Sequence, residues 1–209
     1  MTLSNRAPTG SEVLAPRQRP GRAVAWPVRV VGYTATAWCL GFAAVSGWQL
    51  AIGREPDGPF AAYAEGLAAM IILVLVLKIL GAVMALLAIR SQPLRMSPSL
   101  LAIGLWGAFG LLAIDSAGSI VLAVGNTTGL MEPSAAWESA GGVTPRSILY
   151  LLFFLVGAIL FGVLAGSFHR RHRTPWTAAV IGLLSAPLLL GVVLAIAPRI
   201  LSHLDLLPS

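Results

Sequence analysis

Five long hydrophobic stretches, separated by short polar segments, dominate the chain. They cover residues 24–52, 65–90, 98–124, 147–168 and 176–197. A helix that crosses a lipid bilayer needs about 20 mainly apolar residues, and each stretch is long enough to meet that requirement. We therefore predict an all-α fold, a bundle of five transmembrane helices formed by residues 24–197.

The polar segments outside these stretches predict tails and loops. Residues 1–23 carry four arginines and too few apolar residues to form a core, which indicates a disordered tail. Residues 198–209 are predicted to form a second, short tail, and residues 125–146 the longest loop. Ser97 and Pro98 are typical of a helix start, with serine as the N-cap and proline at the first helical position.

The arginines are distributed unequally between the two sides of the predicted membrane domain. Arg54, Arg146 and Arg199 flank one side. The others flank the opposite side: Arg6, Arg17, Arg19, Arg22, Arg29, Arg90, Arg95, Arg170, Arg171 and Arg173. Loops rich in lysine and arginine stay in the cytoplasm, so we predict a cytoplasmic N-terminus and, after five spans, an extracytoplasmic C-terminus. We expect Arg170, Arg171 and Arg173, the densest basic group, to fix this orientation and to contact anionic lipid headgroups.

The overall composition agrees with embedding in a membrane. Hydrophobic residues make up 57% of the chain and charged residues 11%, whereas soluble proteins contain about 25% charged residues. A net charge of +6 would suggest nucleic acid as the partner of a soluble protein. Here the arginines flank apolar stretches, where orientation in lipid explains them. We therefore predict the lipid bilayer as a partner and no nucleic acid.

The sequence contains few groups that could perform chemistry. Its one cysteine, Cys39, lies inside the first apolar stretch, which excludes an internal disulfide and any site with several cysteine ligands. We find no nucleophile elbow, phosphate-binding loop, cluster of metal ligands or pair of catalytic carboxylates. We therefore predict no catalytic residue, no metal and no other cofactor, and we expect the protein not to be an enzyme.

Lys78, the only lysine, stands in the middle of the second apolar stretch. A charged side chain at the bilayer centre costs about 2.5–3.5 kcal/mol on insertion scales, so it normally faces the protein interior and has a partner. Asp115, in the third stretch, is the candidate partner. At 1.5 Å per residue, Lys78 lies about 18 Å from Arg90 and Asp115 about 25 Å from Pro98, which puts the two at similar depths. We therefore predict an intramembrane charge pair.

Six small residues are candidates for close helix packing, because small side chains let membrane helices approach each other. They are Gly81 and Ala85 on the Lys78 face of the second helix, Gly104 and Ala108 on the Asp115 face of the third, and Gly162 and Gly166 in a Gly-x-x-x-Gly spacing in the fourth.

Two interpretations of the charge pair stay open. In the first, Lys78 and Asp115 form a structural lock that specifies helix packing, a role known for buried ion pairs. In the second, they line a polar cavity and bind a substrate headgroup, an ion or a proton, because intramembrane charges are functional candidates. Outside this pair the stretches contain mainly isolated hydroxyl groups, which favours the lock.

The segments LKILGAVMALLAIR (77–90) and PSLLAIGLWGAFGLLAIDSAGSI (98–120) resemble a family of small multi-spanning bacterial membrane proteins, a domain of unknown function. The resemblance covers residues 24–168. It implies an integral protein of the bacterial cell membrane and carries over no catalytic residue.

Together these observations favour a non-enzymatic accessory or assembly component of a membrane complex, which docks to other membrane proteins or to itself. The alternative is a small oligomeric transporter or channel that uses Lys78 and Asp115 in a central cavity. A transporter predicts a polar cavity that reaches the midplane from one side, and an accessory protein predicts an exposed face of small residues.

Overall fold

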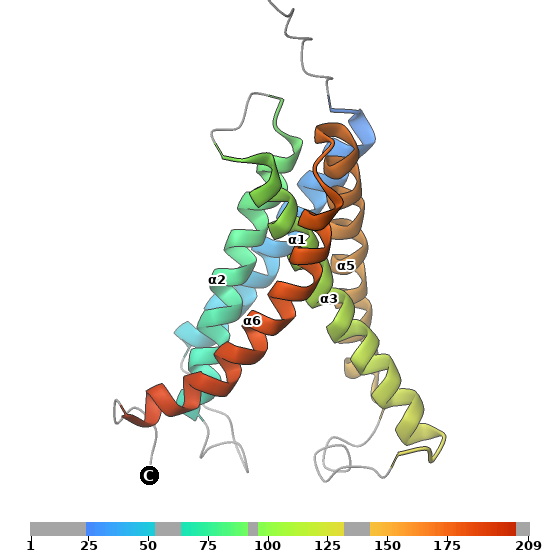
Figure 1. Ribbon diagram of the computed structural model, residues 1–209. Helices are drawn as coiled ribbons and strands as arrows, with labels where there is room; N and C mark the ends of the chain where they lie inside the picture. Colours follow the sequence, from blue (N-terminus) through green and yellow to red (C-terminus); the bar gives the residue numbers. More distant parts are fainter. Residues whose placement is uncertain (1–23, 53–63, 92–95, 132–142, 204–209) are drawn as a thin grey trace, which may run out of the picture.

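The computed structural model describes the backbone of residues 24–52, 64–91, 96–131 and 143–203, and their side chains except those of residues 64–70, 146, 189–190 and 193–203. The first predicted tail and most of the longest loop lie outside these residues. The described helices are α1 (Trp26–Ala51), α2 (Ala64–Ile89), α3 (Pro98–Thr127), α5 (Pro145–His172) and α6 (Trp176–His203) (Figure 1). Residues 198–203, predicted as the start of the second tail, instead continue α6.

Four helices are long and apolar enough to cross a membrane, which agrees with the predicted all-α, multi-span architecture. They are Trp26–Ala51, Ile71–Ile89, Pro98–Thr127 and Ser147–His172. Between 22% and 28% of the residues in their apolar windows are buried, as expected for helices surrounded by lipid. Among the described side chains, the apolar part of α6 is Trp176–Leu188, which is shorter than a span. The fifth crossing and the orientation in the membrane therefore stay predictions.

The first residue of α3 is the one that the sequence predicts. Ser97 occupies the N-cap position and Pro98 the first turn, but the Ser97 side chain makes no capping hydrogen bond. The proline is therefore the feature that fixes this helix start, because its ring presets a helical φ and its missing N–H would have no helical partner.

The helix α5 is longer at both ends than the predicted fourth span. Its first residue is Pro145, because Thr144 and Ser147 cap each other: the Ser147 N–H donates to Thr144 Oγ1 at 3.2 Å, and the Thr144 N–H donates to Ser147 Oγ at 2.9 Å. Its last residue is His172, since Arg173 adopts a left-handed conformation with φ 48°. The basic residues 169–172 are thus part of the helix and not of a loop.

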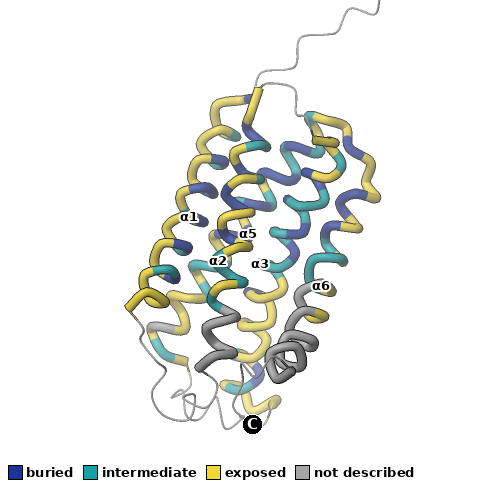
Figure 2. The backbone as a smooth tube through the Cα atoms, turned by 90° about the vertical axis from the view of Figure 1, so that its left-hand side faces the viewer, coloured by how far each residue is buried: buried dark blue, intermediate teal, exposed yellow. Residues whose placement is uncertain are grey.

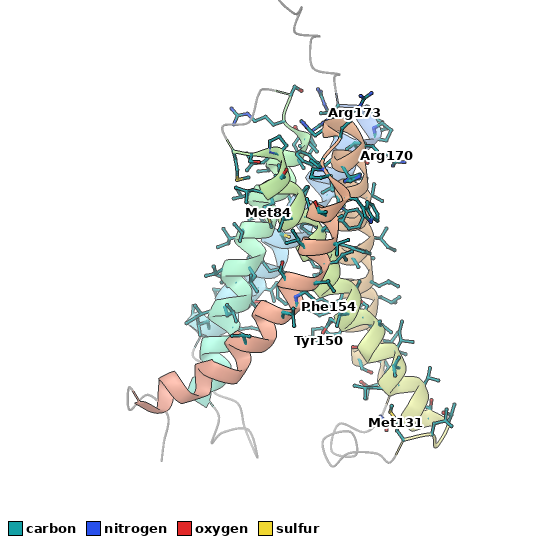
Figure 3. The ribbon with its side chains drawn as sticks, in the orientation of Figure 1. Met84, Met131, Tyr150, Phe154, Arg170 and Arg173 are labelled. Carbon is teal, nitrogen blue, oxygen red and sulfur yellow. The ribbon has the colours of Figure 1, made fainter. Side chains whose placement is uncertain are left out.

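The helices lie close together at one end of the bundle, and at the other end α3 diverges from α2 and from α6 (Figure 1). α2 packs mainly on α1, and α3 packs mainly on α5 and α6. Contacts between α1 and α5 join the α1–α2 pair to the other three helices, whereas α2 touches α3 and α5 only slightly. We call the end at which α2 and α3 diverge the Met131 end, and the opposite one, with Arg170 and Arg173, the arginine end (Figure 3).

α3 and α6 cross at a point built from small residues. A Cβ atom at Gly182 would lie 2.5 Å from the carbonyl oxygen of Ile103 and 3.1 Å from the amide nitrogen of Gly107. A Cβ atom at Gly110 would lie 3.1 Å from the carbonyl oxygen of Leu183. Such close backbone approach is typical of packed membrane helices. The sequence analysis missed these three glycines.

The core consists of alanines and a few large side chains. Its buried alanines come from all five described helices: Ala35, Ala82, Ala85, Ala88, Ala102, Ala158, Ala165 and Ala178. Phe161 and Phe168 of α5 are its largest fully buried side chains. Figure 2 shows buried positions interleaved with exposed ones along the helices, so each helix presents one face to its neighbours and another outward.

Candidate functional site

Lys78 lies in the middle of α2 with its side chain 8% exposed. Its Nζ atom is 3.8 Å from the ring centroid of Trp38, 4.9 Å from that of Phe42 and 5.2 Å from that of Phe154. A cation over a ring face is attracted by the negative π surface, an interaction worth about 2 kcal/mol when both groups are removed from water. The contacts of the Lys78 ammonium are therefore aromatic rings from α1 and α5, which we call the aromatic cage.

The cage is held in place by further aromatic packing. Phe153 stacks on Trp38 with ring centroids 4.7 Å apart and on Phe42 at 5.4 Å, and it meets Phe154 edge-on at 5.7 Å. The indole of Trp38 can approach α5 because Gly157 has no side chain: a Cβ atom there would lie 2.5 Å from the indole. Gly157 thus makes room for the ring that lies nearest the ammonium.

Asp115, the predicted partner of Lys78, lies on α3 and is exposed. Its carboxylate is close enough to interact electrostatically with Lys78, but the described residues contain no ion pair between the two within 4.0 Å. The two side chains are therefore not in direct contact among the described residues, and the predicted charge pair stays a prediction. The two side chains do not meet because α2 packs mainly on α1 and only slightly on α3, and because rings from α1 and α5 occupy the space beside the ammonium.

A cavity of about 260 Å³ lies beside Lys78, between α1, α2, α3 and α5. Most of its wall is apolar, and its two charged residues are Lys78 and Asp115. The other lining residues are Trp38, Cys39, Leu73, Val74, Leu77, Gly81, Ala108, Leu111, Leu112, Phe154 and Phe161. We call it the Lys78 cavity. It gives the buried ammonium one open side in an otherwise packed region.

A second cavity of about 390 Å³ lies toward the Met131 end, between α3 and α5. Its wall contains more polar groups, among them Ser119, Ser147 and Tyr150. Asp115 and Phe154 line both cavities, so the two adjoin. Phe154 and Tyr150 lie between the middle of the bundle and its Met131 end in Figure 3. We call the second cavity the vestibule, because it lies next to the Lys78 cavity on the side of the Met131 end.

At the arginine end, Arg171 takes a role different from the predicted lipid contact. Its side chain is partly buried, its Nη2 donates a hydrogen bond to the carbonyl oxygen of Ala88, and its guanidinium lies 5.6 Å from the ring centroid of Phe168. The last carbonyls of a helix have no partner within that helix, so Arg171 caps α2 from α5. Arg170 and Arg173 are exposed and stay predicted lipid contacts.

Five of the six predicted packing residues lie next to other helices or a cavity. Gly81 and Ala85 are buried, and a Cβ atom at Gly81 would lie 3.2 Å from Cys39 Sγ. Gly104 faces the Met84 sulfur across the α2–α3 contact, Gly162 faces Phe109, and Ala108 lines the Lys78 cavity. Among the described residues, nothing lies within 4 Å of a Cβ atom at Gly166. The prediction of close packing at Gly166 is therefore wrong.

The cage residues are the functional candidates that the sequence analysis missed. Trp38 carries the available signal. Tryptophan normally gathers at the ends of membrane helices, but Trp38 lies in the middle of α1. That N–H is buried without a hydrogen-bond partner among the described residues. The position of a tryptophan in the middle of an apolar helix is therefore the signal from which its contact with a charged side chain could have been inferred.

Comparison with known proteins places no further constraint on the site. No protein-family model, curated protein or solved structure matches this chain. The resemblance to a bacterial family of unknown function therefore stays a prediction, whereas its coarser part, a multi-span membrane protein, agrees with the four long apolar helices.

Proposed function

We propose that this chain is a non-enzymatic membrane protein that binds a small molecule in the Lys78 cavity, as a small transporter or carrier would. The observation that carries the proposal is the position of the cavity, which lies beside an intramembrane charge and adjoins the vestibule. Small-molecule sites are mostly apolar hollows with a few polar groups that orient the ligand. The Lys78 cavity has this character.

The geometry favours ligand binding over a structural lock. A lock requires direct contact between Lys78 and Asp115 and a filled space around them, because an ion pair repays its desolvation only when its geometry is close. Instead, the ammonium contacts aromatic rings, and both charged residues line an open space. Burying a charge beside an unfilled cavity costs free energy, and a ligand bound in the cavity would offset that cost.

The route to the site is proposed to start at the Met131 end. The vestibule lies toward that end and shares two lining residues, Asp115 and Phe154, with the Lys78 cavity. The arginine distribution predicts that this end is extracytoplasmic. Because α2 contacts α3 and α5 only slightly, its movement away from them would break few interactions and could admit the ligand.

An experiment with a filled cavity tests this proposal. Ala108 lines the Lys78 cavity, so Ala108→Phe should fill it. Ala117→Phe makes the same change at an exposed position on the same helix and serves as the control. Native mass spectrometry of protein released from the membrane in mild detergent should show a small molecule bound to the wild type and to Ala117→Phe, and not to Ala108→Phe. Identical bound masses in all three would contradict the proposal.

The accessory role is a second candidate, which one observation supports. Ala37, Gly41 and Ala44 are exposed on one face of α1, and no atom of the described residues lies within 4 Å of a Cβ atom at Gly41. Small residues at this spacing allow another membrane helix to approach closely. Gly41→Leu should therefore abolish co-purification of a partner, or of a second copy of the chain, and leave small-molecule binding unchanged. Gly118→Leu, at an exposed glycine of α3 with equally open surroundings, is the matched control.

A further inference from the structure

The Lys78 ammonium makes no ion pair within 4.0 Å among the described residues. Three rings of the aromatic cage lie close to it, the nearest at 3.8 Å from the ring centroid. The Lys78 side chain also lines the Lys78 cavity. Ring faces attract a cation but cannot accept its hydrogen bonds as a carboxylate or water does, so they compensate only part of the hydration that the ammonium has lost. The cavity side of Lys78 is therefore a place where an acceptor bearing negative charge would bind.

The remaining wall restricts the rest of such a molecule. Leu77 of α2 and Leu111 and Leu112 of α3 line the cavity, and Phe161 of α5 lines it as well. A strongly hydrated inorganic anion would lose its water there without replacement, whereas a hydrocarbon group gains from contact with these side chains. A cavity of about 260 Å³ holds only a small molecule.

On the basis of the proposed function, we infer that the ligand is a small organic anion. Its single anionic group, a carboxylate or a group of similar size, binds the Lys78 ammonium. Its apolar body lies against the leucines and Phe161. The aromatic cage fixes the position of the ammonium, so the anionic group is bound at one depth in the membrane.

Asp115 repels such a ligand, whereas Lys78 attracts it. It lines both cavities, so an anion that moves from the vestibule to Lys78 must pass its carboxylate. In the empty site Asp115 balances the charge of Lys78 from a distance, and in the occupied site it repels the bound anion. Asp115 therefore weakens binding and favours release, as a carrier requires.

The charge preference of the cavity can be measured with a cysteine placed in its wall. In a Cys39→Ala background, Ala108→Cys provides a single thiol that lines the Lys78 cavity. The protein is held in lipid nanodiscs, in which both ends of the bundle are open to the solution. Two reagents of similar size, sulfonatoethyl methanethiosulfonate (an anion) and trimethylammonioethyl methanethiosulfonate (a cation), are then compared by their rates of disulfide formation with this thiol.

The ratio of the anionic to the cationic rate should fall by about tenfold when Lys78→Met is added, as expected for loss of one charge that focuses an approaching ion. Asp115→Asn should raise the ratio, because it removes the repulsion of the anion. Arg170→Met, which removes an exposed charge at the arginine end, should leave the ratio unchanged. If Lys78→Met does not fold, the test rests on Asp115→Asn. An unchanged or lower ratio of the anionic to the cationic rate in that variant would overturn the inference.

The same rates of thiol modification show whether this inference fails alone or together with the proposed function on which it rests. If both reagents modify the thiol with no preference that depends on Lys78, the cavity is accessible and the ligand is not selected as an anion, so the inference fails alone. If neither reagent modifies the folded protein and both modify it after unfolding, the cavity is closed to small molecules. Both the inference and the proposed function would then be wrong.

Discussion

Replacing Gly182 by alanine tests the crossing of α3 and α6, on which the arrangement of the bundle depends. The added Cβ atom would lie 2.5 Å from the carbonyl oxygen of Ile103, about 0.9 Å short of the 3.4 Å at which ordinary contact begins. It would also lie 2.8 Å from Trp106 Cβ and 3.1 Å from the Gly107 nitrogen. Two of these three atoms belong to the backbone of α3, so a side-chain rotation cannot relieve the clash, and the helices must separate.

The expected cost follows from known effects of overpacking, which destabilises a protein by about 1–3 kcal/mol. Alanine also stabilises a helix relative to glycine by about 1 kcal/mol. Gly191→Ala, on the same helix and with no described atom within 4 Å of the new Cβ atom, is expected to have only this second effect and is the matched control. Measured against Gly191→Ala, Gly182→Ala should therefore lose about 1–3 kcal/mol of stability.

Thermal unfolding in mild detergent, followed by tryptophan fluorescence, measures this difference. In a protein of 150–250 residues 1 kcal/mol shifts the melting temperature by about 2–4 °C, so Gly182→Ala should melt about 2–12 °C below Gly191→Ala. Equal or higher melting of Gly182→Ala would mean that the two helices do not approach as closely as the structure describes.

Two further predictions concern the C-terminal end and the middle of α2. Arg171→Gln removes the guanidinium that caps the Ala88 carbonyl and should cost about 1.5–3 kcal/mol, whereas Arg170→Gln, at an exposed residue, should change the melting temperature little. In a double-mutant cycle, Lys78→Met and Trp38→Leu should couple by about 1–2 kcal/mol through the lost cation–π contact. Trp48→Leu, an exposed tryptophan of the same helix, should not couple with Lys78→Met, and equal coupling at both tryptophans would refute the aromatic cage.

The helices could be predicted from the sequence because their signals are local. The length of each apolar stretch gives the number and position of the long helices, and Pro98 gives the first residue of α3. The depth of Lys78 is also local, since it follows from the rise per residue. These properties do not depend on which helices are neighbours.

The surroundings of Lys78 could not be predicted in the same way, because depth does not determine the neighbour. Lys78 and Asp115 line the same cavity, but α2 packs mainly on α1 and only slightly on α3, so rings and not a carboxylate contact the ammonium. Gly162 and Gly166 show the same limit. The two glycines belong to one Gly-x-x-x-Gly motif, yet in the part of the chain that the structure describes Phe109 lies beside Gly162 and no atom lies within 4 Å of a Cβ atom at Gly166.

The cavity and the crossing are two consequences of one distribution of small residues. Near the arginine end, Gly104 lets α3 approach Met84 of α2, and Gly107, Gly110 and Gly182 draw α3 and α6 together. α3 and α6 separate beyond their crossing, and α3 also leaves α2 toward the Met131 end (Figure 1). Asp115 is eight residues beyond Gly107, about 12 Å along α3 at 1.5 Å per residue. It therefore lies where the helices have parted, and the space between it and Lys78 is the cavity. A bundle packed by small residues along its whole length would have brought the two charges together and left no room for a ligand.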